Sequence, residues 1–130
     1  MKVVIIGGGA AGVTAATRLR RLDENAEIII LEQNNELSVA SCGLLYYLSG
    51  EVNDRNDLIN TTPEKLKQQY NIDARLNAEV EFINRQEKSV TIKGRGKEYY
   101  DKLIFTIGAY QLRPDIDGVL AEQVFTIRDL

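Results

Sequence analysis

Two short apolar runs, residues 3–6 and 28–31, flank an alanine-rich stretch from 11 to 22. Continuous runs of β-branched and leucine residues are typical of strands buried on both faces of a parallel sheet. The intervening stretch repeats its apolar positions at helical spacing, which predicts a helix packed on that sheet. The positions expected to face the sheet are Ala11, Ala15, Leu19 and Leu22.

The middle of the chain predicts loops and two short helices. Residues 33–40 are expected to form an exposed loop, and residues 51–60 a polar loop. Between them, the apolar segment 41–48 predicts a helix whose N-cap is the Ser41 hydroxyl. The segment 62–70 begins with Thr-Pro, a favourable N-cap followed by a favourable first helical residue, and therefore predicts a second helix.

Towards the carboxyl end, the period of the pattern changes. Residues 79–83 and 89–93 alternate in the manner of half-buried strands, and glycines 94 and 96 mark a further turn, so a small antiparallel meander is expected. Residues 103–108 return to a buried strand of the parallel type. The fold class predicted for this 130-residue chain is α/β, a Rossmann-like βαβ parallel sheet with a small antiparallel β-meander insertion, in a single domain.

A glycine-rich turn follows the first strand directly. Gly7 permits a tight turn, Gly9 lets the backbone approach a pyrophosphate, and Gly12 lets helix and sheet pack closely. The helix N-terminus adds free N–H donors for phosphate. Glu32 ends the second strand, where a carboxylate can accept hydrogen bonds from ribose hydroxyls. Strand, turn, helix, strand and acid occur in the order of a dinucleotide-binding unit.

Composition narrows the classes of partner. The net charge of -3 and the absence of a dense basic cluster argue against nucleic acid. No apolar run approaches the length of a transmembrane helix, so no membrane partner is expected and a cytoplasmic location is predicted. No metal is expected.

The chain has one cysteine, Cys42, so no intramolecular disulfide is possible. A thiol acts in redox chemistry as its thiolate, a state that a helix N-terminus favours, and Ser41 would place Cys42 there. The alternative is a small buried hydrophobe, the commonest fate of a free cysteine. The position of Cys42 after the adenosine-binding half favours the redox role, because a dinucleotide would project its far half towards this segment.

The chain resembles the single-cysteine branch of the FAD-dependent pyridine nucleotide-disulfide oxidoreductases, which includes coenzyme A disulfide reductase, NADH oxidase and NADH peroxidase. The resemblance extends over essentially all 130 residues. Besides the glycine motif, the segments that carry it are 20–23, the Ser-x-x-Ser-Cys-Gly-Leu-x-Tyr-Tyr segment at 38–47, 62–65, 100–104 and 124–128.

This resemblance implies an FAD cofactor, with NAD(P)H as the co-substrate of the full-length enzyme. It implies that Cys42 is the redox cysteine beside the flavin. Its reduced state would be a thiolate, and its oxidised state either a mixed disulfide or a sulfenic acid. Thr106 to Gly108 would close over the flavin-bearing side. The implied cofactor-binding residues are Gly7, Gly9, Ala10, Ala11, Gly12, Glu32, Gln33, Val80, Thr106 and Gly108.

The substrate implied by the resemblance is coenzyme A disulfide or a related small disulfide. Oxidase and peroxidase members carry a histidine in the glycine turn, whereas this chain has Ala10 there and no histidine anywhere. Arg18 and Arg21 lie about one turn apart on one helix face, where they can bind an anionic phosphate together. The implied substrate-binding residues are Thr14, Arg18, Arg21, Ser38, Ser41 and Tyr70.

Residues 1–130 contain one glycine fingerprint, whereas the family also has an NAD(P)H-binding and a dimerisation domain. The chain is therefore expected to be the N-terminal portion of an FAD-binding domain, a fragment without steady-state NAD(P)H oxidation of its own, from a homodimeric enzyme. Two alternatives stay open at this stage: a fragment of an NADH oxidase that cycles through a cysteine sulfenic acid, and a non-catalytic dinucleotide-binding module.

Overall fold

The computed structural model describes residues 1–112, 114–118, 122 and 124–128. Its main sheet is parallel, with the strand order β5-β2-β1-β9. These strands are β1 (Lys2–Ile6), β2 (Glu27–Leu31), β5 (Asp73–Arg75) and β9 (Lys102–Phe105). The helix α1 (Ala10–Leu22) connects β1 to β2, so the predicted βαβ unit is confirmed.

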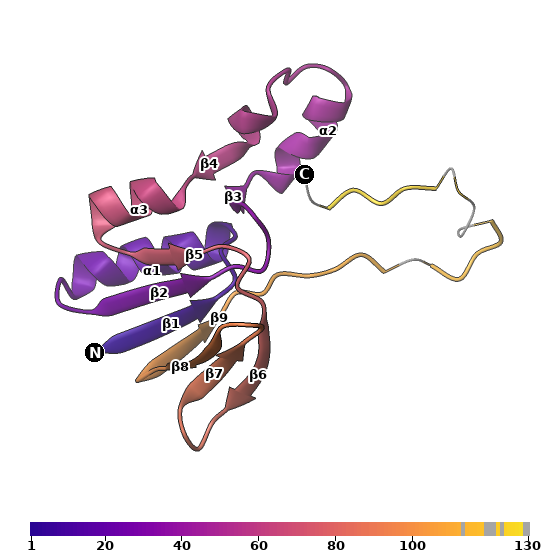
Figure 1. Ribbon diagram of the computed structural model, residues 1–130. Helices are drawn as coiled ribbons and strands as arrows, with labels where there is room; N and C mark the ends of the chain where they lie inside the picture. Colours follow the sequence, from indigo (N-terminus) through magenta and orange to yellow (C-terminus); the bar gives the residue numbers. More distant parts are fainter. Residues whose placement is uncertain (113, 119–121, 123, 129–130) are drawn as a thin grey trace.

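Both faces of this sheet are covered (Figure 1). Val3 of β1 belongs to a core that includes residues of α1 and of α3 (Pro63–Tyr70). Val4, one residue later, belongs to a second core with side chains from the antiparallel meander. Because successive side chains of a strand point to opposite faces, a continuous apolar run is what a strand covered on both sides requires.

The meander consists of β6 (Val80–Asn84), β7 (Ser89–Ile92) and β8 (Gly96–Tyr99), paired antiparallel in that order. This confirms the predicted insertion, with strand bounds that differ by about one residue from those expected. The prediction for α3 is confirmed in more detail: the Thr62 hydroxyl accepts a hydrogen bond from the Lys65 N–H at 3.3 Å. The helix ends at Tyr70, and its C-cap residue is Asn71, which has the left-handed conformation.

The prediction that the two polar segments are loops is confirmed for residues 33–36, 40 and 51–54 and wrong for residues 37–39 and 55–60. They contain a hairpin of β3 (Leu37–Val39) and β4 (Ile59–Thr61), preceded on the β4 side by the 3₁₀ helix η2 (Arg55–Leu58). The hairpin forms because each segment has one leucine that the core buries: Leu37 is 1% exposed and Leu58 is 3% exposed. A single buried leucine per segment leaves no periodic apolar pattern in the sequence.

The predicted face of α1 is also wrong in part. Ala11 and Leu22 are exposed, and the residues of this helix that the structure buries are Gly12 and Ala16. A Cβ on Gly12 would lie 2.0 Å from the Gly7 carbonyl oxygen, so this glycine must face the turn and its position sets the rotation of the helix. The strand β9 is less buried than predicted, since Phe105 is 55% exposed.

Candidate functional site

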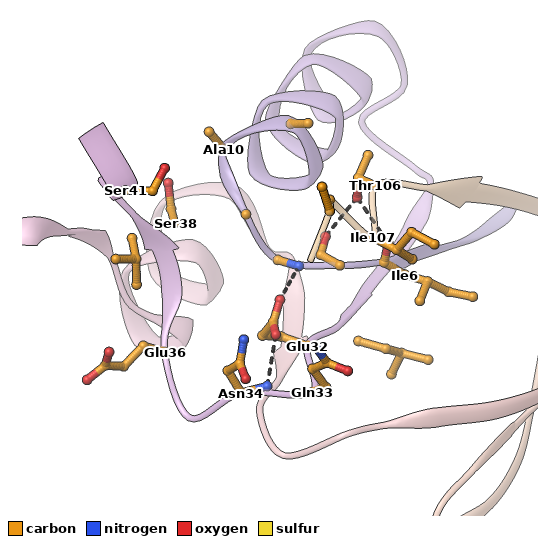
Figure 2. Close-up of a pocket in the computed structure, with 18 of the residues that line it drawn as sticks. Ile6, Ala10, Glu32, Gln33, Asn34, Glu36, Ser38, Ser41, Thr106 and Ile107 are labelled. Carbon is orange, nitrogen blue, oxygen red and sulfur yellow. Dashed lines mark hydrogen bonds between the residues drawn. The ribbon is translucent and has the colours of Figure 1, made fainter. Parts of the chain in front are cut away.

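A cavity of about 820 Å³ opens at the carboxyl ends of β1, β2 and β9. Its walls are the glycine turn, the loop after β2, the strand β3 with the cysteine segment, and the chain after β9 (Figure 2). Ligands of open parallel sheets bind at this end of the strands, and the volume lies within the range of small-molecule and cofactor sites.

The glycine turn closes tightly against the end of β9. Gly7 has φ +104°, and a Cβ there would lie 2.2 Å from the Thr106 carbonyl oxygen. The Thr106 hydroxyl donates to the carbonyl oxygens of Gly7, at 2.8 Å, and of Ile6, at 3.1 Å. Thr106 thus fixes the shape of the turn in addition to lining the cavity.

The first turn of α1 presents open backbone amides to the cavity. Gly9 is the N-cap residue, and no side chain in the described parts of the chain caps this helix. The first bond that returns to Gly9 comes from the Val13 N–H at 3.1 Å, so the amides of residues 10–12 have no partner within the helix. A Cβ on Gly9 would meet nothing within 4 Å. Open donors and the positive end of a 13-residue helix are the chemistry that binds a pyrophosphate.

Glu32 lines the cavity between the glycine turn and the loop at Gln33 and Asn34, and the residue is only 7% exposed (Figure 2). Its Oε2 accepts a hydrogen bond from the Gly8 N–H at 2.6 Å, and its Oε1 accepts one from the Asn34 N–H at 2.8 Å. An ionised carboxylate offers about four acceptor sites, so each oxygen retains one for a ribose hydroxyl. The acid therefore fits the adenosine half of a dinucleotide.

Gly8 lines the cavity and is a residue of the candidate site that the sequence alone did not single out. A Cβ on it would lie 2.3 Å from the Leu37 side chain. Its N–H donates to Glu32, and its carbonyl oxygen accepts from the Ser38 N–H at 2.8 Å. The signal for this role was a glycine in the middle of three consecutive glycines, at a position that the fingerprint leaves variable.

Arg128 was also missed as a site residue. It lines the cavity, and its guanidinium lies 3.0 Å from where a Cβ on Gly108 would stand. Gly108 has φ +70°, which also disfavours a side chain at this position. The guanidinium of Arg128 adds a donor for an anionic ligand at the cavity wall. Because Arg128 lies far from the glycine motif in the sequence, no local pattern connects the two.

The cysteine segment is a 3₁₀ turn, η1 (Ser41–Gly43), followed by the short helix α2 (Leu44–Leu48). The predicted Ser41 cap is wrong: Ala40 is the N-cap residue, no side chain caps the turn, and the Gly43 N–H closes it on the Ala40 carbonyl oxygen at 2.8 Å. Cys42 is exposed, which contradicts the alternative of a buried hydrophobe. Ser41 lines the cavity, whereas Cys42 is not among its lining residues.

The structure brings most of the predicted cofactor residues together. Those that line the cavity are Gly7, Gly9, Ala10, Ala11, Glu32, Gln33, Val80, Thr106 and Gly108, joined by Ser38 and Ser41 of the predicted substrate set. Gly12 packs behind the turn. Thr14, Arg18 and Arg21 share the exposed side of α1, and Tyr70 packs against the core; none of these four lines the cavity.

Among the residues that the structure describes, no helix has the length and apolar character of a membrane span. The same part of the chain contains no group of three or more His, Cys, Asp or Glu side chains that could hold a metal ion.

Comparison with known proteins gives relatives over the whole length of the chain. The family described as pyridine nucleotide-disulphide oxidoreductase matches residues 1–130. The coenzyme A disulfide reductase of Staphylococcus haemolyticus is 34% identical over 134 residues, which cover 99% of this chain and 30% of that protein. The chain thus spans about 30% of the length of this curated relative.

Solved structures of related proteins also match nearly the whole chain. The structure described as reduced Bacillus anthracis CoADR-RHD is 41% identical with a TM-score of 0.92, and the match covers 99% of this chain and 24% of that one. The water-forming NADH oxidase from Lactobacillus brevis, bound to NADH, is 31% identical with a TM-score of 0.86, and the match covers 99% of this chain and 30% of that one. These neighbours share the predicted Rossmann-like fold.

Proposed function

Because the chain belongs to the pyridine nucleotide-disulphide oxidoreductase family, we propose that its cavity is the FAD site of a flavoprotein disulfide reductase. Members of this family are FAD enzymes that use NAD(P)H. The observation that carries the proposal is the pairing of uncapped amides at the start of α1 with the Glu32 carboxylate, in one cavity at the strand ends. Residues 1–130 are the FAD-binding portion of the enzyme.

Each end of the cavity has a separate binding task. The amides of Ala10 and Ala11 would hold the pyrophosphate, and Glu32 would accept hydrogen bonds from the adenosine ribose. Gln33, Val80, Thr106 and Gly108 also line the cavity. Gln33 and Val80 would contact the adenosine half, and Thr106 and Gly108 the flavin half. When bound, FAD supplies two-electron redox chemistry between NAD(P)H and sulfur.

Cys42 is the nucleophile of the proposed reaction, and its exposed sulfur is accessible to a disulfide. Its thiolate attacks one sulfur of coenzyme A disulfide, the S–S bond breaks, and one coenzyme A thiolate leaves while the other stays bound to Cys42 as a mixed disulfide. Two electrons from NAD(P)H in the whole enzyme then cleave the mixed disulfide, which releases the second coenzyme A thiolate and restores the Cys42 thiolate.

A reductase is favoured over an oxidase by the residue at the glycine turn. The chain contains no histidine, and Ala10 at the mouth of the turn has no side chain that could transfer a proton to a peroxide or to oxygen. Sequence identity also favours a reductase, since the chain is 41% identical to the CoADR-RHD structure and 31% identical to the NADH oxidase.

Two measurements on the chain test this function. FAD titration followed by quenching of flavin fluorescence should give saturable binding. Incubation with coenzyme A disulfide at neutral pH, followed by intact mass spectrometry, should add one coenzyme A moiety to the chain and none to the Cys42→Ser variant.

The competing functions predict different products. A dimedone adduct at Cys42 after peroxide, without any coenzyme A adduct, would support the oxidase cycle through sulfenic acid. FAD binding with an inert Cys42 would support a non-catalytic module, and no FAD binding would contradict the proposal as a whole.

A further inference from the structure

Ser38 has an unusual backbone for a residue within a strand. It lies in the middle of β3 with φ +49°, in the left-handed region that a serine seldom adopts, and it is 7% exposed. Such conformations persist only where the surrounding structure imposes them, and they occur often at binding sites.

Two hydrogen bonds hold the Ser38 backbone. Its N–H donates to the Gly8 carbonyl oxygen at 2.8 Å, and its carbonyl oxygen accepts from the Asn60 Nδ2 at 2.6 Å. The pairs Leu37 with Thr61 and Val39 with Ile59 place Ser38 opposite Asn60 in the hairpin. The Ser38 backbone is therefore bound on one side by the glycine turn and on the other by the side-chain amide of Asn60.

The serine that is held in this way lines the cavity, and Asn60 does not. Figure 2 shows Ser38 and Ser41 on the same wall, facing the start of α1 at Ala10. We propose that Asn60 is a positioning residue: through the Ser38 carbonyl it holds the serine wall of the cavity in place for the coenzyme A arm of the disulfide substrate. The ligand part of this inference rests on the proposed function.

The variant Asn60→Asp tests the inference because it keeps the shape of the side chain and removes the donor. We expect faster hydrogen exchange at the Ser38 amide. The concentration of coenzyme A disulfide that gives half the maximal rate of Cys42 modification should rise about five- to tenfold, which corresponds to the loss of about one hydrogen bond. The rate with hydroxyethyl disulfide, which has no coenzyme A arm, should stay unchanged. Asn53→Asp, on the exposed loop before η2, is the matched control for both readouts.

Glycine adopts positive φ at little cost, so Ser38→Gly should reduce the need for Asn60. In that background, Asn60→Asp should change the urea midpoint less than it does in the parent chain. Unchanged Ser38 exchange in Asn60→Asp, or an equal loss of rate with both disulfides, would overturn the inference. If the parent chain forms no coenzyme A adduct, the proposed function and the ligand part fail together, and the Ser38 exchange alone decides whether Asn60 holds the serine.

Discussion

The Glu32 carboxylate accepts a hydrogen bond from the Gly8 N–H at 2.6 Å, and this bond joins the end of β2 to the turn after β1. The Gly8 carbonyl oxygen in turn accepts from Ser38, so the peptide groups on both sides of Gly8 are engaged within the protein. The acid that would bind the ribose thus also fixes the backbone that precedes the pyrophosphate site. A ligand then meets donors and acceptors already in position, which lowers the entropic cost of binding.

Replacing this acid should affect folding as well as binding. In Glu32→Ala, the Gly8 and Asn34 N–H groups lose their acceptor, which should lower the free energy of unfolding by about 1–3 kcal/mol and weaken FAD binding. Urea denaturation of the ligand-free chain and FAD titration measure the two effects. Glu32→Gln keeps one acceptor oxygen and the shape of the side chain. Its free energy of unfolding and its FAD affinity should therefore lie between those of Glu32→Ala and the parent. A urea midpoint that does not change in Glu32→Ala would show that the bond to Gly8 has no stabilising role.

Two glycines of the motif should differ in what an added methyl group does. In Gly12→Ala, the Cβ would lie 2.0 Å from the Gly7 carbonyl oxygen, so helix and turn must separate. Overpacking of this kind costs about 1–3 kcal/mol or more of unfolding free energy.

Gly9→Ala is the matched comparison. Gly9 has φ -68° and open space where a Cβ would stand, so its substitution should change the unfolding free energy by less than about 0.5 kcal/mol. It should nevertheless weaken FAD binding, by roughly tenfold, because the methyl enters the cavity above the open amides. Thermal unfolding with and without FAD separates the two effects, and similar destabilisation in both variants would contradict this division of roles.

The sequence predicted those parts of the fold whose signals are local and repeated. The run at β1, the glycines and the run at β2 follow one another, and α3 has its Thr62 cap and its terminal Asn71 within ten residues. Both patterns reflect backbone rules that do not depend on distant contacts. The placement of Glu32 in the cavity followed from the same order of elements.

Other features depended on contacts between distant segments. The hairpin of β3 and β4 has three-residue strands, too short to show alternation, and it forms because Leu37 and Leu58 are buried. A Cβ on Gly43 would lie 2.5 Å from the Leu58 side chain, so the small size of this glycine serves packing between the two segments. No local pattern around Gly43 predicts that Leu58, from a different segment, packs against it.

The arginines of α1 also have different roles that the sequence alone did not separate. Arg20 donates from Nε to the Tyr70 carbonyl oxygen at 2.7 Å and from Nη2 to the Asn71 carbonyl oxygen at 3.0 Å. These bonds join α1 to the end of α3. Arg20→Ala should therefore lower the free energy of unfolding by about 2 kcal/mol, since charged hydrogen bonds are lost along with the packing of the stem.

Arg18→Ala supplies the contrast on the same helix. Arg18 is exposed, so its loss should change the unfolding free energy by less than about 0.5 kcal/mol. If Arg18 binds a phosphate of coenzyme A, as the family resemblance implies, the variant should react more slowly with coenzyme A disulfide and at the parent rate with hydroxyethyl disulfide. Urea midpoints and adduct rates of the two variants measure both effects, and equal destabilisation by the two substitutions would refute the distinction.

A charged network joins the meander to the main sheet and should make stability depend on pH. Glu98 of β8 pairs with Lys2 of β1 at 2.7 Å and with Arg75 of β5 at 2.5 Å, and its side chain is 15% exposed. Burial raises the pKa of Glu98, but the hydrogen bonds from Lys2 and Arg75 together outweigh burial and hold this pKa below its usual value. The hydrogen bond to Glu98 also raises the pKa of Lys2, although burial opposes the change.

The sign of the acid effect follows from the lowered pKa. Since the folded chain binds the Glu98 proton more weakly than the unfolded chain, the network stabilises the fold above the unfolded pKa of about 4.3. This stabilisation is lost as the pH falls through the folded pKa. Glu98→Gln should lower the free energy of unfolding at pH 7 by roughly 1–2 kcal/mol and flatten its fall below about pH 4.5. Urea midpoints from pH 7 to pH 3 measure this, with Glu81→Gln on the exposed side of β6 as the matched control. An acid limb equally steep in Glu98→Gln and the parent would place the titrating carboxylates elsewhere, and the network would then be a surface feature without influence on the docking of the meander.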